Sequence, residues 1–421
     1  MKAFDKLLEY LIYAYIIILP LFPSKYSISG IPFNGDVILA AAILVYLLKL
    51  MIYRSSRERF AMGFKDFFTH SLGISMALLI FAMFFSILYS MDRSMAIRES
   101  ARFTTYIVLF FIIKYEMNQE RVLRNIILVY FMVCAYIFWD GINEYARAVM
   151  RTGSFSYSWE LRAASTMENY NNFGAFALIA FFPAVMLFAG EKKWSYRIIY
   201  GALALMALGS IIVSFSRNAL LGVIIGFVLL IILYSRKFII AFIIAGAIAL
   251  MMPATRTRLL QIADMSQNES RLKVWKTAYY MIKDHFLLGV GNGNFYTQYP
   301  GYIEKHPELV NTYDWEQVFH PHNILLKIQS ELGVLGTAAF LGIIVSHFRD
   351  LFRYLKSEEN QHFLQFFKGF LVSSIAFMMM NLIDNYFSAP KVIAYFWLFI
   401  AVYQSRACSG KGSEAEQQNA N

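Results

Sequence analysis

The sequence predicts an all-α protein: a polytopic membrane helical bundle of about twelve transmembrane helices, with one large outer loop that itself contains helices. Of the 421 residues, 58% are hydrophobic and only 16% are charged, whereas an ordinary soluble domain is about 25% charged. Several stretches approach the ~20 apolar residues that a helix needs to cross a bilayer. Every second segment between them, starting from the N-terminus, is basic, a pattern that indicates membrane orientation.

Twelve segments qualify as spans when flanking residues are allowed to complete the shorter ones. The clearest are essentially free of charge and comprise residues 71–91, 173–190, 198–215, 219–234 and 238–252. The others comprise residues 7–22, 37–53, 103–114, 126–139, 324–346, 369–383 and 392–404. We interpret residues 1–21 as part of the first span and not as a cleaved signal, because no small-residue cleavage site follows and many spans do.

The orientation follows from the positions of lysine and arginine. With the N-terminus in the cytoplasm, every predicted inner segment is basic, and twelve spans return the C-terminus to the same side. Both termini are therefore expected to be cytoplasmic, in the cell inner membrane or plasma membrane. The net charge of +10 is then explained by inner segments and not by nucleic-acid binding. We expect a bundle over residues 1–405, an outer loop over 253–321 and a disordered cytoplasmic tail over 406–421.

The outer loop is expected to contain a helix. Asn268 or Ser270 is a suitable N-cap for a helix over residues 271–285, in which apolar residues recur at three- and four-residue steps: Leu272, Trp275, Tyr279 and Ile282. The stretch GVGNGNF then predicts a turn. It is not a dinucleotide-binding fingerprint, because no strand precedes it.

Arginines on the outer side run against the orientation rule and require an explanation. They include Arg98, Arg102 and Arg162. Arginine binds phosphate in a bidentate manner, so an anionic ligand is one explanation. Salt bridges are the other, with four acidic residues as available partners: Asp92, Glu99, Glu144 and Glu160.

Two further arginines stand out by position. Arg217 lies in a connection of only a few residues between two apolar spans, which holds it at the outer membrane edge; snorkelling or loop pairing is the alternative interpretation. Arg271 opens the loop helix, where a cation opposes the helix dipole. That unfavourable position suggests another role, and the alternative is a surface arginine paired with Glu269 or Asp264.

His322 follows Pro321, and proline is favoured at the first position of a helix. The sequence therefore predicts His322 in the first helical turn of the tenth span, where a neutral imidazole could accept a proton from a hydroxyl. An interfacial histidine with a hydrogen-bond partner is the alternative. His320 and His322 could also bind a metal, but no cysteine is near and no Asp-X-Asp motif occurs on the outer side. We expect no metal and no other cofactor.

Three segments, in order, resemble the O-antigen ligase and polymerase superfamily. The stretch HPHN, which ends at Asn323, is followed after nine intervening residues by Gly333 and after two more by Gly336. SFSRNALLG around Arg217 resembles that family's arginine-bearing outer loop, and ESRLKVWKTAYYMIKDHFLLGVGNGNF resembles the helix and glycine turn of its large loop. The resemblance implies an inverting, metal-independent glycosyltransferase that takes a glycan from undecaprenyl diphosphate.

The acceptor implied by the resemblance is a hydroxyl on lipid A-core for a ligase, on another repeat unit for a polymerase, or on protein in some members. Arg217 and Arg271 would clamp the diphosphate, and His322 would position or deprotonate the acceptor. Weaker candidates for binding phosphate or sugar are Arg98, Arg102, Arg162 and His320, and for sugar Glu168.

A flippase for the same lipid-linked glycan is the alternative from another class. It would show charge at mid-membrane and paired halves, whereas the clean spans have uncharged centres and no internal repeat is found.

Overall fold

The computed structural model describes residues 1–23, 27–28, 31–32, 34–262, 269–310, 318 and 320–419, with backbone alone at 27–32 and after residue 408. The elements follow in chain order: α1 (Lys2–Leu21), β1 (Ser27–Ile28), β2 (Ile31–Pro32), α2 (Gly35–Ile52), α3 (Arg54–Thr69), α4 (Ser71–Ser86), α5 (Arg93–Glu116), α6 (Glu120–Thr152), η1 (Trp159–Leu161), η2 (Ser165–Met167), α7 (Tyr170–Gly190), α8 (Trp194–Ser214), α9 (Arg217–Leu233), α10 (Phe238–Met251), α11 (Pro253–Leu260), α12 (Glu269–Asp284), α13 (Phe295–Lys305), η4 (Pro307–Leu309), α14 (Ile324–Ser357), α15 (Gln361–Asn381), η6 (Tyr386–Ser388) and α16 (Pro390–Asn419).

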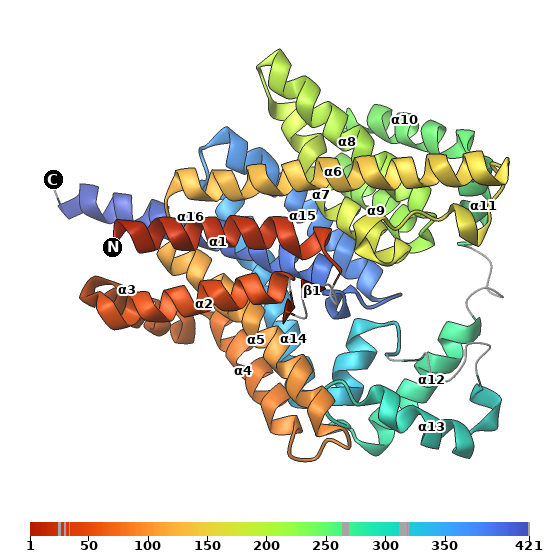
Figure 1. The fold of residues 1–421 in the computed structure, drawn as a ribbon, viewed down its shortest axis with the longest axis horizontal. Coiled ribbons are helices and arrows are strands. Elements are labelled where there is room, and N and C mark those ends of the chain that lie inside the picture. Colours follow the sequence, from red (N-terminus) through yellow and green to blue (C-terminus); the bar gives the residue numbers. More distant parts are fainter. Residues whose placement is uncertain are drawn as a thin grey trace.

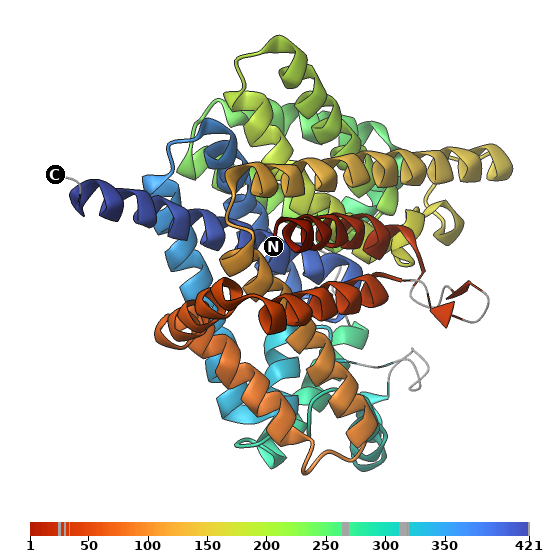
Figure 2. The same ribbon diagram turned by 60° about the vertical axis from the view of Figure 1, so that its left-hand side comes forward.

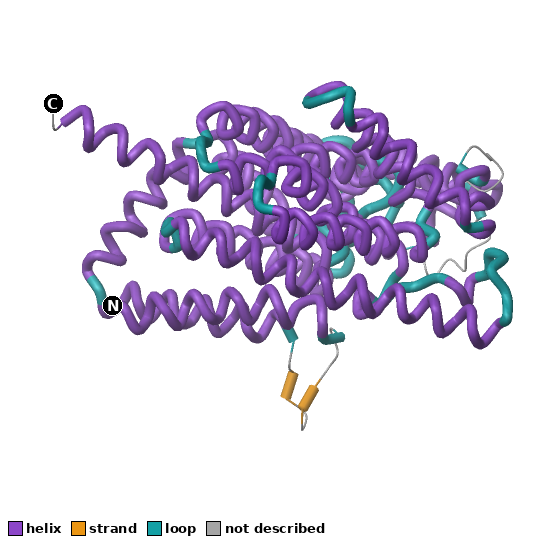
Figure 3. The backbone as a smooth tube through the Cα atoms, turned by 90° about the horizontal axis from the view of Figure 1, so that it is seen from above, coloured by secondary structure: helices purple, strands orange, loops and turns teal. Residues whose placement is uncertain are grey.

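The predicted helical membrane class is confirmed. Every predicted span overlaps a helix, and six described helices are long and apolar enough to cross a bilayer: α2, α6, α7, α8, α14 and α15. The number rises to eight if two bent pairs count as one span each, α3 with α4 at 85° and α10 with α11 at 107°. The count of twelve stays a prediction. The antiparallel pair β1–β2, which lies outside the helices in Figure 3, was not predicted.

The core of the bundle lies around α7, α15 and α16. α7 packs against both α8 and α15, and its side chains from Phe173 to Leu187 are nearly all buried. α1, α6 and α16 run along one another in Figure 1 and in the turned view of Figure 2. Burial of apolar side chains all round a helix is expected for one enclosed by other helices.

The C-terminal helix α16 extends beyond the last predicted span, which ends at residue 404, and its backbone continues to Asn419. The division into bundle, outer loop and cytoplasmic tail stays a prediction. Once a helix is formed, each further residue adds a backbone hydrogen bond at little cost, and the stretch from Glu414 to Gln418 consists of good helix formers. A polar segment that follows a packed helix can therefore extend it.

The large loop is attached to a break in α14. At Gly333 the backbone is non-helical, with φ 62° and ψ −155°. The amide of Val290 donates to the carbonyl of Ser330, and that of Gly291 to the carbonyl of Glu331, both at 2.8 Å. The predicted glycine turn thus fills the break, and α12 and α13 gather beside this end of α14, apart from the main bundle (Figure 1).

Candidate functional site

Arg217 and Arg271 line one cavity of about 260 Å³. The other lining residues are mostly apolar and come from α9, α12 and the segments that follow α11 and α15: Asn218, Leu221, Ile262, Leu272, Trp275 and Ile383. Two guanidinium groups, 54 positions apart in the sequence, therefore share one largely apolar space. Such a site favours an anion, because charge interactions strengthen where water is excluded.

The local fold fixes Arg217. Phe215 takes the left-handed conformation, with φ 48°, and ends α8. Ser216 then caps α9 by accepting from the amide of Ala219 at 3.4 Å, so Arg217 is the first residue of α9. Its Nη1 donates to the carbonyl of Gln261 at 3.1 Å. Arg217 therefore lies on a short and well-ordered connection, as the sequence predicts.

Arg271 lies in the first turn of α12. Its predicted alternative partner Glu269 is ion-paired with Lys273 at 3.1 Å, and Asp264 lies outside the described residues. The predicted helix is present, and its predicted apolar face is partly covered: Trp275 and Ile282 are half-buried, and Leu272 and Tyr279 are exposed. The most buried face of α12 is the adjacent one, whose Val274, Ala278 and Met281 pack with α13.

The side chains of the predicted face are left partly free for other contacts. Leu272 and Trp275 turn toward the cavity, and Tyr279 is exposed. The helical spacing of large apolar residues therefore identifies the helix and a half-covered face, whereas contacts with α13 bury the adjacent face. Leu272 and Trp275 form part of the cavity wall.

His322 forms a hydrogen-bonded dyad with Asp384. Nδ1 of His322 and Oδ1 of Asp384 are 2.9 Å apart, and the His322 side chain is 37% exposed against 11% for Asp384. An ionised carboxylate only accepts hydrogen bonds, so Nδ1 carries the proton and donates. Nε2 is then the ring nitrogen that faces away from Asp384 and can contact another group.

The prediction that His322 lies in the first turn of a helix is wrong. Asn323 is the N-cap of α14, where its Oδ1 accepts from the amides of Leu325 and Leu326, and His322 precedes it with φ 49°. Pro321 lies two residues before the cap and not at the first helical position. Asn323 also donates from Nδ2 to the carbonyl of Leu382 at 2.8 Å, which fixes this turn against the end of α15.

The charges around the dyad stabilise the Asp384 carboxylate. Burial alone would raise the pKa of Asp384, but the hydrogen bond from His322 and the positive charge of Arg271 outweigh it, and the pKa falls to about 2. Burial, followed by the neighbouring imidazole of His322, lowers the pKa of His320 to about 3. Nδ1 of His320 accepts from the amide of His322 at 3.3 Å. His320 is thus a neutral support for the turn.

The cavity and the dyad meet at the end of α15. Ile383 lines the cavity and Asp384 is the next residue. Asn218, also in the cavity wall, donates from Nδ2 to the carbonyl of Met380 at 3.0 Å and to the hydroxyl oxygen of Tyr386 at 3.1 Å. The structure therefore brings the three principal predicted residues, Arg217, Arg271 and His322, to one region.

Two buried arginines support the Arg217 turn. Arg258 donates from Nε to the carbonyl of Phe215 at 3.0 Å and from Nη1 to Oε1 of Gln261 at 2.8 Å. Arg162 donates from Nε to the carbonyl of Ser214 at 3.2 Å. Its guanidinium carbon lies 3.1 Å from the ring centroid of Tyr170, and burial lowers its pKa to about 10. Arg162, a weaker candidate for binding the donor, is instead packed beneath the connection that carries Arg217.

The remaining weaker candidates lie elsewhere. Arg102 is ion-paired with Glu99 at 2.8 Å. Arg98 lies four residues earlier on α5 and is exposed; the pKa of Asp92 is lowered chiefly by the hydrogen bond from Tyr296, with a smaller contribution from the charge of Arg98. Glu168 is ion-paired with the buried Lys391 at 3.0 Å. None of these residues lines the cavity between α9 and α12.

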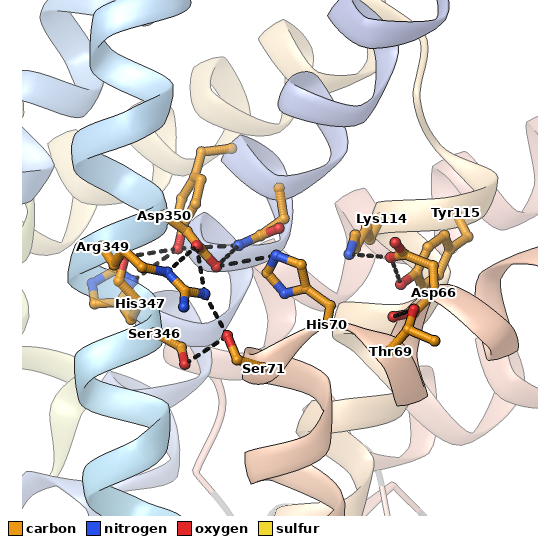
Figure 4. Close-up of polar contacts among 12 residues, drawn as sticks. Asp66, Thr69, His70, Ser71, Lys114, Tyr115, Ser346, His347, Arg349 and Asp350 are labelled. Atoms are coloured by element: carbon orange, nitrogen blue, oxygen red, sulfur yellow. Dashed lines mark hydrogen bonds and ion pairs between the residues drawn. The ribbon is translucent and has the colours of Figure 1, made fainter.

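A second polar cluster joins the bend between α3 and α4 to α5 and α14 (Figure 4). Asp350 accepts from Arg349 at 3.0 Å, and its other oxygen lies 3.5 Å from Nε2 of His70. Asp66 accepts from Lys114 at 2.7 Å. The charges of this cluster are balanced within it, and it contributes no residue to the cavity that holds Arg217 and Arg271. Its role is to hold the bent helices together.

Sequence reasoning missed Asp384 and Arg258. Asp384 ends an apolar stretch in the segment NLIDNYFS, on the side of the bundle where the predicted topology also places His322. The sequence signal for Asp384 is an acidic residue at the end of a predicted span, on the same side of the membrane as the candidate base His322. Arg258 has no comparable signal, because nothing in PATRTRLL indicates which of its arginines is buried.

Comparison with known proteins supports the resemblance. Residues 201–341 match the family model described as O-Antigen ligase. The chain is also similar to the Teichuronic acid biosynthesis protein TuaE of Bacillus subtilis (strain 168), with 22% identity over 362 residues, which cover 79% of this chain and 72% of that protein. The matched interval contains Arg217, Arg271 and His322. The similarity to the O-antigen ligase and polymerase superfamily that the three segments predict is confirmed.

Proposed function

We propose that this chain, a membrane protein related to the O-antigen ligases and polymerases, is a glycosyltransferase that moves a glycan from undecaprenyl diphosphate to an acceptor hydroxyl. One observation carries the proposal: two arginines face a single cavity that adjoins a His–Asp dyad. The family match supports the same class of substrate.

Arg217 and Arg271 bind the diphosphate of the donor in this proposal. Charge develops on the leaving diphosphate as the glycosidic bond breaks, and preorganised cations lower the barrier by stabilising it. The guanidinium group suits this task, since it holds its proton and makes two parallel hydrogen bonds to phosphate oxygens. The apolar cavity wall strengthens the interaction by excluding water.

His322 is the general base. Nε2 accepts the proton of the acceptor hydroxyl while that oxygen attacks the anomeric carbon of the donor. The bond between the anomeric carbon and the diphosphate oxygen breaks, and its electron pair leaves with the diphosphate. A single displacement of this kind inverts the anomeric configuration. Asp384 is a positioning residue that holds the imidazole in the required tautomer and stabilises the imidazolium that forms.

The proposed topology has twelve spans, both termini in the cytoplasm and the cavity at the outer boundary of the inner or plasma membrane. The polyprenyl tail of the donor would remain in the bilayer while the diphosphate enters the cavity between α9 and α12. The positive-inside distribution of basic residues supports this orientation.

Ligase and polymerase differ in the acceptor. Transfer to lipid A-core or protein is the reaction of a ligase, and transfer to another repeat unit is that of a polymerase. Polymerase is the second candidate, because the similar protein of Bacillus subtilis is named for teichuronic acid biosynthesis. A ladder of longer lipid-linked glycans would identify a polymerase.

The test uses purified protein in proteoliposomes that contain a glycan on undecaprenyl diphosphate and a candidate acceptor. We expect His322→Ala and Arg217→Ala to insert and fold but to accumulate unused donor. Lys276→Ala is the matched control, because Lys276 is an exposed cation on α12 that does not line the cavity. Transfer at the wild-type rate by both site variants would overturn the assignment, and transport of donor without product would indicate a flippase.

A further inference from the structure

Three consecutive apolar side chains are exposed at the end of α12. Phe286, Leu287 and Leu288 are 57%, 70% and 52% exposed, and we refer to them as the apolar tripeptide. They occupy a turn between α12 and the buried glycine turn. Contiguous exposed apolar surface of this kind marks a site of contact with a partner or a membrane.

The backbone carbonyls of the apolar tripeptide are hydrogen-bonded within the protein, as an environment without water requires. Each of its three carbonyls accepts a hydrogen bond from the protein: from Nε2 of Gln329 at 2.9 Å, from the amide of Val334 at 3.1 Å and from the hydroxyl of Tyr89 at 2.6 Å. Lipid offers no replacement partner for a carbonyl. An ordinary surface turn in water has no need for three such bonds.

The apolar tripeptide continues the exposed surface of α4, which belongs to a helix pair apolar enough to enter a membrane. Phe81 and Phe85 of α4 are exposed, as are Leu88 and Met91 just beyond its end. Tyr89 lies within this stretch and is the residue bonded to the carbonyl of Leu288. The surface that α4 presents to lipid therefore extends onto the large loop.

Polar residues precede the apolar tripeptide. Lys283 and His285 are exposed on the last turn of α12 and just after it, and Asp284 between them accepts from the hydroxyl of Tyr302 at 2.8 Å. A cation and an imidazole next to an apolar tip match the order of headgroups and acyl chains at a membrane surface. The same order would be unfavourable at a protein interface that buried Lys283 without a carboxylate partner.

We propose that the apolar tripeptide inserts into the acyl-chain region of the adjacent leaflet and anchors the far end of α12 to the bilayer. α12 spans 16 residues, or about 24 Å at ~1.5 Å per residue, and carries Arg271 at its other end. Lipid anchoring thus fixes the position of α12, which forms one wall of the cavity, relative to the membrane surface. The inference concerns membrane contact alone and does not depend on the proposed reaction.

The experiment places a nitroxide spin label at Leu287→Cys in a Cys134→Ala, Cys408→Ser background, reconstituted in phosphatidylethanolamine and phosphatidylglycerol vesicles. Accessibility to oxygen reports lipid, and accessibility to a water-soluble nickel chelate reports water. Phe81→Cys on α4 is the lipid reference, and Lys305→Cys on α13 is the aqueous reference. We expect the label at 287 to resemble that at 81, with high oxygen and low nickel accessibility.

Two outcomes would overturn the proposal. Nickel accessibility equal to that at 305 would place the apolar tripeptide in water, and protection from both reagents would mean that protein covers it. If a cysteine variant does not fold, Leu287→Trp replaces it. Quenching by brominated lipid beyond that of the six native tryptophans supports insertion, and quenching equal to the native level contradicts it.

Discussion

Nδ1 of His322 donates to Oδ1 of Asp384 at 2.9 Å, across 62 positions of sequence. Asp384 follows α15 and His322 precedes α14, so the dyad depends on how the ends of two helices meet. Asn323 makes that junction directly, through its bond to the carbonyl of Leu382. The dyad is therefore a product of packing between spans and not of local sequence.

Asp384→Asn should lower the rate of glycan transfer by about two to four orders of magnitude, the usual contribution of an oriented base. An amide can present its NH₂ group to Nδ1 and so favour the wrong tautomer. Since Asp384 acts through His322, we expect the loss in kcat and little change in the KM for donor. The assay is initial-rate transfer in proteoliposomes, with the exposed Glu308→Gln as control. A rate near that of the wild type would remove Asp384 from the site.

The sequence predicts the parts of the site that depend on local context. Arg217 is fixed by the short connection between two apolar spans, and the glycine turn by residues that take positive φ. It does not predict Asp384 or Arg258, because their roles arise from contacts between segments far apart in the chain. The most buried face of α12 was not predicted for the same reason: large apolar spacing identifies the helix, but contacts with α13 bury the adjacent face with Val274, Ala278 and Met281.

Gly333→Ala should detach the large loop. Gly333 has φ 62°, and an added Cβ would lie 2.1 Å from the carbonyl oxygen of Leu287. The strain of a left-handed residue, about 1–3 kcal/mol, adds to the clash. We expect a lower midpoint of thermal unfolding in detergent and strongly reduced transfer.

The control for this substitution is Gly246→Ala in α10, where a Cβ would meet no atom within 4 Å. Alanine is favoured over glycine within a helix by about 1 kcal/mol, so that variant should be unchanged or slightly stabilised. An unchanged midpoint for Gly333→Ala would show that the break in α14 does not require glycine.

Arg258→Lys should weaken donor binding. The guanidinium of Arg258 holds the carbonyl of Phe215 and the side chain of Gln261 at once, whereas an ammonium is a point charge with a different reach. The turn that carries Arg217 would lose one of these bonds. We expect the KM for donor to rise about tenfold, equivalent to ~1.4 kcal/mol, with a smaller effect on kcat. Arg256→Lys, an exposed arginine on the same helix, is the control. Equal KM values for the two variants would contradict the supporting role of Arg258.

His320→Asn should make stability less sensitive to mild acid. The pKa of His320 is lowered from 6.5 to about 3 in the folded protein, chiefly by burial. Between those values the unfolded chain binds a proton that the folded protein does not, so stability falls as the pH falls below about 6.5, by up to ~1.4 kcal/mol per pH unit. Asparagine keeps an acceptor for the amide of His322 but does not titrate.

The measurement is the midpoint of thermal unfolding of both proteins at pH 7 and pH 5. Asp384 does not titrate in this window, because its pKa is about 2; its contribution to stability is lost only at lower pH, as the carboxylate is protonated. We therefore expect a larger fall for the wild type than for the variant, and the difference between the two falls isolates His320. Equal falls would mean that His320 gains its proton as readily in the folded protein as in the unfolded chain, which would contradict its burial as a neutral imidazole.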